Sequence, residues 1–494
     1  MRAAFGFGFG LPLGDSGDAP AIDWNFTGGV LPSALTFSRA SLATMYDAAG
    51  TLVWCPHNLL TYSEQIDNAA WAKLGLGAGS TPVITANAGV APDGTTTADR
   101  VQLNCGGSTI SDRSICNQSV SGLMTGRQYT GAVYIKAYSA GEVGKQLRLF
   151  GDLLVTEAVV TLTADWQLVQ TSGTAAAASG NFGLETRGTV TANTTADFLM
   201  WGARLNVGPL QPYYPTTSAA YYGPRLTYDP VTHSALGLLV EEQRTNLLTY
   251  SEALDNATWA KNGGASITAN VATAPDGYLT ADRLTVVTGA SDSLESPGVS
   301  ITSGTSYTAT ARLLLGTSTT VTLNMSNAAA WSGGVNPAAT FNLSTGAMTG
   351  VAANTTAKVE ALPGGWFAVS ITATAAATTT SSLRVVPVSS SSTTIVWGLQ
   401  LEAGAFATSY IPTGAASATR AADVVTCTGS AFSQWFNASE GTLVVEAVMP
   451  NSTVGSTNIM NIVEAKDASG NESIKVYQYE TWFGAAIRHG GAVQ

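Results

Sequence analysis

The chain has few charged residues. Of its 494 residues, 22 are Lys or Arg and 33 are Asp or Glu, which is 11%, against roughly 25% in an average soluble domain. A disordered chain combines low hydrophobicity with high charge, and a hydrophobic fraction of 45% excludes it. Helical bundles need Glu, Lys and Leu at helical spacing, which are scarce here. With these classes excluded, a composition of small β-forming residues, with Gly, Asn and Asp for turns, predicts an all-β protein.

Among the charged residues, basic ones are fewer than acidic ones, and the formal net charge is −11. Nucleic-acid binding needs basic grooves that neutralise phosphates, so we expect no nucleic-acid partner. Binding to anionic membrane surfaces is disfavoured for the same reason. No apolar run approaches the length of about 18 residues that crosses a bilayer, so we expect no membrane insertion. Glycines and a proline interrupt the N-terminal apolar run, which makes it a poor signal-peptide core.

Cysteine and histidine are also rare. No two of the four cysteines form a C-x-x-C pair, which argues against a zinc or redox site. Cys105 and Cys116 are 11 residues apart and could be bridged across a loop, but two free thiols are the favoured interpretation. The histidines His57, His233 and His489 lack metal-ligand spacing. We therefore predict no catalytic residues, no metal site and no enzymatic activity.

The dominant positive feature is an internal repeat. Asn58–Lys73 recurs as Asn246–Lys261 with 13 of 16 positions identical, and Ala91–Val101 recurs as Ala274–Leu284 with 8 of 11 identical. Further matched segments follow in the same order in both halves. A whole domain is therefore duplicated, which differs from a solenoid with a period of roughly 20 to 50 residues.

Period-two alternation predicts the strands. In the first repeat Leu199, Trp201, Ala203 and Leu205 alternate with more polar neighbours, and Ile395, Trp397, Leu399 and Leu401 do so in the second. One apolar face is typical of a half-buried strand, so we place Trp201 and Trp397 in the core. Such strands, separated by polar loops without a helical pattern, predict a two-sheet antiparallel sandwich.

Four phrases carry a family resemblance: FSRASLATMYDAAGTL, RLTYDPVTHSALGLLVEEQRTNLLTYSEALDNATWAKN, APDGYLTADRL and WGLQLEAGAFATSYIPTGAASATRAADVV. They resemble a module of bacteriophage and prophage structural proteins, such as tail fibres, head fibres and decoration proteins. The resemblance covers roughly residues 35–425. The segment from Gly441 onward resembles the start of a concanavalin-like or laminin-G-like sandwich. The match defines an architecture and does not identify a ligand.

The resemblance implies tandem jelly-roll domains of the carbohydrate-binding-module type. We expect an N-terminal anchor and linker over 1–57, a first jelly-roll repeat over 58–218 and a linker over 219–245. A second repeat follows over 246–418, and 419–494 is the start of a third, lectin-like sandwich that we expect to be truncated.

For function, the resemblance implies a virion protein that is assembled in the bacterial host cytoplasm and exposed on the particle. Its expected partners are other virion proteins, through the N-terminal segment, and copies of itself in a homo-oligomer, most simply a trimer. Weak binding to host-surface glycans would gain from multivalency. Two alternatives remain: a capsid decoration or adaptor protein without a ligand, and a polysaccharide depolymerase.

Sugar rings stack on exposed aromatic faces, and ligand contacts concentrate on variable loops. The aromatic residues that are not duplicated between the repeats are therefore the candidate glycan contacts: Trp331 in the loop-like NAAAWSGGVNP, then Tyr221 and Tyr222.

Acidic residues suggest two further sites. Loop carboxylates beside the Asp93-Gly94 and Asp276-Gly277 turns could hold a structural calcium ion, although plain turns are favoured and no cofactor is expected. Asp99-Arg100 could form an ion pair or pin the turn. A depolymerase would need paired carboxylates, but the adjacent Glu241 and Glu242 point to opposite faces of a strand.

Overall fold

The computed structural model describes residues 2–7, 23–151, 158–436, 441–446, 459–466, 473–479, 482–489 and 492–493. The chain divides into two compact units. One comprises Ser38–Leu42 and Trp54–Arg225, and the other comprises Met1–Phe37, Ala43–Val53 and Leu226–Gln494. The described part is almost entirely β-structure in antiparallel sheets, which confirms the predicted all-β class. No described helix is both long and apolar enough to span a bilayer.

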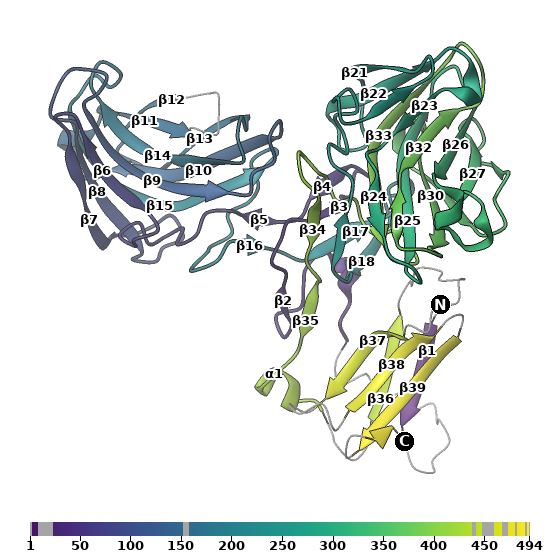
Figure 1. Cartoon of the computed structure of the whole chain (residues 1–494). Coiled ribbons are helices and arrows are strands. Elements are labelled where there is room, and N and C mark those ends of the chain that lie inside the picture. Colours follow the sequence, from purple (N-terminus) through teal and green to yellow (C-terminus); the bar gives the residue numbers. More distant parts are fainter. Residues whose placement is uncertain are drawn as a thin grey trace. The chain divides into compact units, whose positions relative to one another are not determined.

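The first repeat forms a sandwich of two five-stranded sheets, labelled in Figure 1. One sheet has the order β13-β10-β15-β8-β7: Gln167–Thr174, Gln128–Ala137, Thr195–Val207, Ala98–Asn104 and Ser80–Gly89. The other has the order β12-β11-β14-β9-β6: Ala158–Thr161, Gln146–Gly151, Ser179–Arg187, Arg113–Ser121 and Ala72–Leu76. Their facing sides bury one apolar core, which includes Phe182, Leu184, Leu147 and Phe198.

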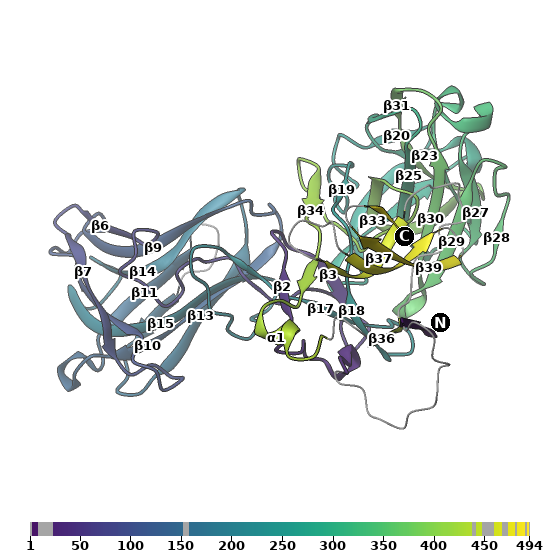
Figure 2. The same ribbon diagram turned by 90° about the horizontal axis from the view of Figure 1, so that it is seen from below.

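The second repeat forms a sandwich of two six-stranded sheets, seen from two sides in Figures 1 and 2. The first has the order β21-β22-β33-β25-β30-β29: Ser266–Thr273, Leu279–Val286, Ser392–Ala403, Ser306–Leu315, Trp366–Thr374 and Thr356–Ala361. The second has the order β20-β23-β32-β26-β27-β28: Ala260–Asn262, Ser293–Glu295, Leu383–Pro387, Thr320–Met325, Ala338–Asn342 and Met348–Thr349.

A β-bulge at the same glycine interrupts the long strand of each repeat. Gly202 and Gly398 adopt φ of 64° and 62°, and the register to the neighbouring strand shifts at both. The extra residue reverses the alternation. Ala203 and Leu205 therefore face the main core, whereas Trp201 is buried in a separate cluster on the other side of the sheet. The predicted single apolar face is wrong at this point, although Trp201 and Trp397 are buried as predicted.

A buried asparagine explains why the NLL phrase is repeated. Asn58 donates to the carbonyls of Ala203 and Tyr214, and its Oδ1 accepts from Leu60 and Leu205 N–H. Asn246 makes the same four kinds of hydrogen bond in the second repeat. Each side chain satisfies its full hydrogen-bonding capacity at the bulged strand, as a buried amide requires.

Short elements connect the sandwiches: β2 Thr36–Ser38, β3 Thr44–Tyr46, β4 Leu52–Trp54, β5 His57–Asn58, β16 Tyr221–Tyr222, β17 Arg225–Tyr228, β18 Ala235–Leu239, β19 Arg244–Asn246, β34 Ala418–Arg420 and β35 Val424–Thr426. One edge pair, β24 Val299–Ile301 and β31 Thr379–Ser381, belongs to the second repeat. The described helices are α1 Ser430–Ser433 and short 3₁₀ turns.

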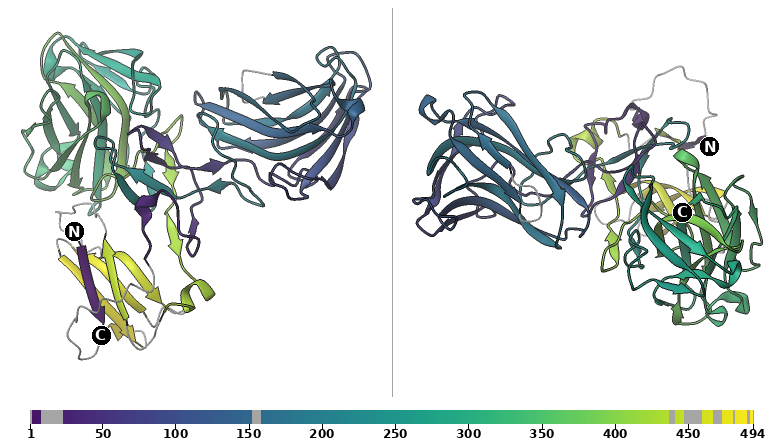
Figure 3. Two further views of the ribbon diagram at one scale, coloured as in Figure 1. Left: turned by 180° about the vertical axis from the view of Figure 1, so that it is seen from behind. Right: turned by 90° about the horizontal axis from the view of Figure 1, so that it is seen from above.

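The N-terminal strand pairs with a strand from the C-terminal region. Strand β1, Arg2–Phe7, pairs antiparallel with β36, Gly441–Glu446, and Figure 3 shows this purple strand among the yellow C-terminal ones. Four further strands form one sheet: β37 Ile459–Lys466, β38 Ser473–Tyr479, β39 Trp482–His489 and β40 Ala492–Val493. An anchoring role for the N-terminal segment stays a prediction.

Candidate functional site

Trp331, the first candidate glycan contact, lies in the core of the second sandwich. Only 1% of the residue is exposed, and its Nε1 donates to the Ser326 carbonyl at 3.0 Å. Its ring packs edge-on against Tyr307, with ring centres 6.2 Å apart. A ring without an exposed face cannot stack on a sugar, so we correct the expectation. Its unduplicated loop suggested exposure, but the 3₁₀ turn Ala328–Ala330 (η4) folds the side chain inward.

Tyr221 and Tyr222 form β16, which pairs with His57 and Asn58 of β5. Both are half-buried, and burial raises the pKa of each hydroxyl above its usual value. The Tyr221 ring stacks on Tyr214 with centres 5.1 Å apart, so one of its faces is already covered. A role of these two tyrosines in glycan binding stays a prediction.

The other residues singled out in the sequence have structural partners. Glu241 accepts hydrogen bonds from Ser409 and pairs with Arg420 at 2.7 Å, while Glu242 pairs with Arg244. Cys105 and Cys116 are both buried free thiols. Among the described residues, no group of three or more His, Cys, Asp or Glu side chains is arranged to hold a metal ion.

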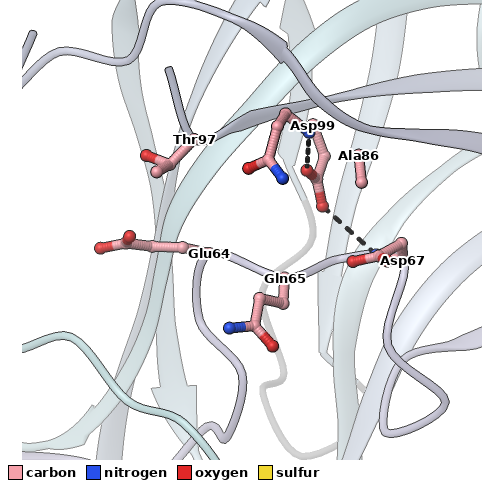
Figure 4. Close-up of a pocket in the computed structure, with 7 residues that line it drawn as sticks. Glu64, Gln65, Asp67, Ala86, Thr97 and Asp99 are labelled. Carbon is pink, nitrogen blue, oxygen red and sulfur yellow. Dashed lines mark hydrogen bonds between the residues drawn. The ribbon is translucent and has the colours of Figure 1, made fainter. Parts of the chain in front are cut away.

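A small acidic pocket lies between the first turn of the repeat and strands β7 and β8 (Figure 4). It encloses about 230 Å³ and is lined by Glu64, Gln65, Asp67, Ala86, Asn87, Thr97 and Asp99. The Asp99 carboxylate accepts hydrogen bonds from the backbone N–H groups of Ile66, Asp67 and Asn87, at 2.6 to 3.3 Å. The Glu64 side chain extends away from Asp99 and accepts a hydrogen bond from the Tyr213 hydroxyl. Asp99 thus joins the turn to the sheet.

The second repeat duplicates this arrangement. Asp282 accepts hydrogen bonds from the N–H groups of Leu254 and Asn270 at 2.9 Å. Burial raises the pKa of Asp282 to about 6, although these hydrogen bonds lower it. Asp99 also has a raised pKa for the same reason. The neighbouring Arg100 pairs with Asp197, and Asp99 holds the turn at Ile66 and Asp67, which is a different turn from Asp93-Gly94. In each repeat, a carboxylate that binds backbone N–H groups therefore holds the turn to the sheet.

The Asp93-Gly94 segment has the hydrogen bonds of a plain turn. The Asp93 carboxylate accepts from both the N–H and the hydroxyl of Thr95, which makes it a plain turn former.

A polar cluster on the outward face of the second sheet of the first sandwich is the best candidate site. Leu147, Leu149, Phe182 and Leu184 face the core, so the residues that alternate with them on β11 and β14 point outward. The cluster, which we call the arginine cluster, consists of Arg113 on β9, Arg148 on β11, and Glu185 and Arg187 on β14. It is unusually well buried for an outward face, because Glu185 is 0% and Arg148 4% exposed.

Two asparagines extend the arginine cluster along the same face. Asn117 lies on β9 opposite Gly183, and its Nδ2 donates to Asn181 Oδ1 at 2.9 Å. The Asn117 Oδ1 is buried and has no hydrogen-bond partner among the residues that the structure describes. Leaving a buried acceptor unpaired is costly, so this oxygen has an unmet hydrogen-bonding capacity.

The equivalent face of the second sandwich has the same kind of residues with a different charge. Arg384 on β32 pairs with Glu295 on β23 at 2.8 Å, and Asn262 donates to Glu295 at 2.6 Å. Asn324 on β26, opposite Arg384, also has a buried Oδ1 without a hydrogen-bond partner in the described part of the chain. A polar face with an unpaired amide oxygen is therefore a shared property of both repeats.

Sequence reasoning missed this face. The β14 segment NFGLETR alternates apolar Phe182 and Leu184 with polar Glu185 and Arg187, which is also the pattern of an ordinary solvated face. The burial of the polar residues comes from β9 and β11, whose contributing residues lie 37 to 72 positions away.

No family model matches the chain, and no curated protein sequence matches it. Among solved structures, the tandem CBM22 modules of Paenibacillus barcinonensis Xyn10C align over 71% of this chain and 98% of theirs, at 12% identity and a TM-score of 0.23.

Two further structures are similar at the same level. The tandem CBM51 modules of Streptococcus pneumoniae Sp3GH98 align over 75% of this chain and 99% of theirs, at 8% identity and a TM-score of 0.18. The enzymatically active domain of bacteriophage CBA120 tailspike protein 4 aligns over 31% of this chain and 21% of its own, at 10% identity and a TM-score of 0.22. Scores of this size determine neither a common fold nor a common function.

Proposed function

We propose that this chain is a glycan-binding β-sandwich protein of a phage virion appendage, and that the outward face of β9, β11 and β14 holds the glycan. The observation that carries the binding part is the unpaired Asn117 Oδ1 beside Asn181 and the arginine cluster. Sugars present hydroxyl groups that both donate and accept hydrogen bonds, and this face offers both kinds of partner.

The appendage part of the proposal rests on the resemblance of residues 35–425 to phage structural proteins. Low charge and abundant Thr, Ser, Ala and Gly suit durable β modules that display a site. A weak site on each copy gains about 10² to 10⁴ in avidity when several copies act together. Display and weak binding therefore fit one function, adsorption to a host surface.

A glycan array probed with the full chain tests the binding part. We expect the full chain to bind a defined subset of the arrayed glycans. Asn117→Ala should weaken this binding about tenfold, because the variant lacks the amide oxygen that accepts the hydrogen bond. Asn342→Ala is the control, since that side chain serves only an exposed turn at Ser344 and Thr345. An array on which no glycan binds the folded chain would contradict the proposal, as would equal effects of the two variants.

A further inference from the structure

We infer that the first sandwich has a second ligand site, a groove on the outward face of β7, β8 and β15, and that this groove binds an uncharged saccharide. These strands belong to the sheet opposite the one that contains β9, β11 and β14. The inference goes beyond the proposed function, because it assigns another site and does not require a glycan on the other face.

A solvent-exposed groove of about 350 Å³, which we call the β8 groove, lies near the β7 edge of this sheet (Figure 1). Its volume falls within the roughly 300–1,000 Å³ of small-molecule sites. Gln102 and Asn104 line it and alternate along β8 with the core residues Val101 and Leu103. Val83, which pairs with Gln102 from β7, also lines the groove and is 58% exposed. A ligand can therefore reach the groove from solvent.

A long connection between β10 and β11 forms one wall of the β8 groove. It spans residues 138–145 and contains the 3₁₀ turn Ala140–Glu142 (η2), and Glu142 and Lys145 line the groove. In the second repeat the corresponding connection, between β25 and β26, spans only 316–319. Ligand contacts concentrate on variable loops, and this wall is a property of the first repeat.

The two repeats attach this connection to the sheet differently. In the first repeat the Glu142 carboxylate accepts from Asp197 N–H at 2.9 Å. Thr393 has the place of Asp197 in the second repeat, and its N–H donates to the Thr317 hydroxyl at 2.9 Å, while its carbonyl accepts from Thr317 and Ser318 N–H. The short connection is thus bonded directly to the strand, so the β8 groove does not follow from the duplicated fold.

Each charged side chain that lines the β8 groove has an ionic partner. Asp197 accepts hydrogen bonds from Nε and Nη2 of Arg100 at 2.8 and 2.5 Å. Lys145 pairs with Glu142 at 2.9 Å. An ionic ligand would have to compete with one of these pairs, whereas an uncharged ligand leaves both intact. The lining therefore favours an uncharged ligand.

Two amide side chains of the groove have hydrogen-bonding capacity left. Gln102 Nε2 donates to Asp197 at 3.2 Å, and its Oε1 has no hydrogen-bond partner among the described residues. Asn104 Oδ1 accepts from Gly106 N–H at 2.9 Å, and its Nδ2 has no partner within the described ranges. An acceptor and a donor thus lie two residues apart on one face of β8, about 7 Å along the strand. Neighbouring hydroxyl groups of a saccharide can serve both, since a hydroxyl donates and accepts.

Apolar surface beside these amides indicates a sugar ring in preference to a small polar solute. Val83 lines the groove, and Tyr138, 42% exposed, borders it, because its N–H donates to the Asp197 carbonyl at 3.1 Å. The Arg100 guanidinium lies 3.9 Å from the centre of the Tyr138 ring and holds it in place. A saccharide presents apolar C–H groups and hydroxyl groups together, which matches this mixed surface.

Calorimetric titration of the full chain with uncharged oligosaccharides tests the inference. The probes are cello-, malto-, xylo- and mannotetraose, together with every uncharged oligosaccharide retained on the glycan array, and tetragalacturonate is the acidic comparison. We expect at least one uncharged probe to bind more tightly than tetragalacturonate. Its affinity should stay nearly constant as NaCl rises from about 0.05 M to about 0.5 M, because salt screens only charged contacts.

Variants of the groove localise this binding. Gln102→Ala removes the free acceptor and should weaken binding about tenfold. Val83→Trp places a large ring in the groove at an exposed strand position and should weaken binding by at least as much. The matched controls are Thr285→Ala and Ser266→Trp, which change the paired positions of β22 and β21 in the second sandwich. We expect both controls to bind normally, and circular dichroism checks the folding of each variant.

Three results would overturn the inference: no uncharged probe binds the folded chain, tetragalacturonate binds more tightly than every uncharged probe, or both groove variants bind normally. The proposed function is tested separately by Asn117→Ala. Binding that this variant loses and the groove variants keep overturns the inference alone. The opposite pattern overturns the proposed face of β9, β11 and β14 and supports the β8 groove.

Discussion

At the scale of single residues, His57 shows how burial selects a protonation state. The residue is 1% exposed, its ring nitrogen Nδ1 donates to the Cys55 carbonyl at 2.7 Å, and Nε2 accepts from Val207 N–H at 2.8 Å. One nitrogen must donate and the other must accept, so the ring is neutral. Burial lowers its pKa from 6.5 to about 4.

The lowered pKa predicts acid sensitivity. The unfolded chain binds a proton near pH 6.5 and the folded chain near pH 4, so His57 contributes its full stability above pH 6.5. That contribution falls as the pH drops toward 4, by up to about 3 kcal/mol. Urea unfolding at several pH values measures it. His57→Gln, which keeps a donor and an acceptor, should flatten the slope, and identical slopes would contradict the prediction.

At the scale of elements, the bulge sets the environment of the duplicated tryptophans. Because Gly398 reverses the alternation of β33, Trp397 packs against Tyr410 with ring centres 4.8 Å apart, away from the main core. Trp201 packs against Tyr213 at the same distance in the first repeat. Positive φ at both glycines is the local condition for this arrangement.

We predict that Gly398→Ala destabilises the chain by about 1–2 kcal/mol, because the left-handed conformation is higher in free energy for alanine than for glycine. Its Cβ would also lie 3.1 Å from Arg312 Cδ and 3.3 Å from the Tyr410 ring. Thermal unfolding of the full chain measures the effect. Gly414→Ala is the control, since a Cβ there meets nothing within 4 Å, and a Gly398 variant as stable as this control would refute the role of the bulge.

At the scale of the whole molecule, multivalent display requires an oligomer. The predicted trimer gives a mass near three times 50.6 kDa in light scattering after size-exclusion chromatography. Antibodies against the chain should also label intact phage particles at a defined position. A chain that is strictly monomeric, and whose antibodies label no particle, would contradict the appendage proposal. Glycan binding by the first sandwich would still be tested by the array.

The sequence alone determined the all-β class, the duplication and the approximate strands. These properties are local: period two, turn residues and repeated phrases are visible within about ten residues. The repeated Asn58, Asp99 and Gly202 were visible as repeats, but their roles were not, because each acts on backbone groups distant in the chain or on a neighbouring strand.

Only the tertiary structure decided which residues are accessible and which charges meet. Trp331 looked like a loop aromatic, yet it is buried, because its short turn packs onto the core. No local pattern links Arg113, Arg148 and Glu185, yet three strands bring them together. Burial and charge pairing depend on partners far apart in the chain, and no local pattern encodes them.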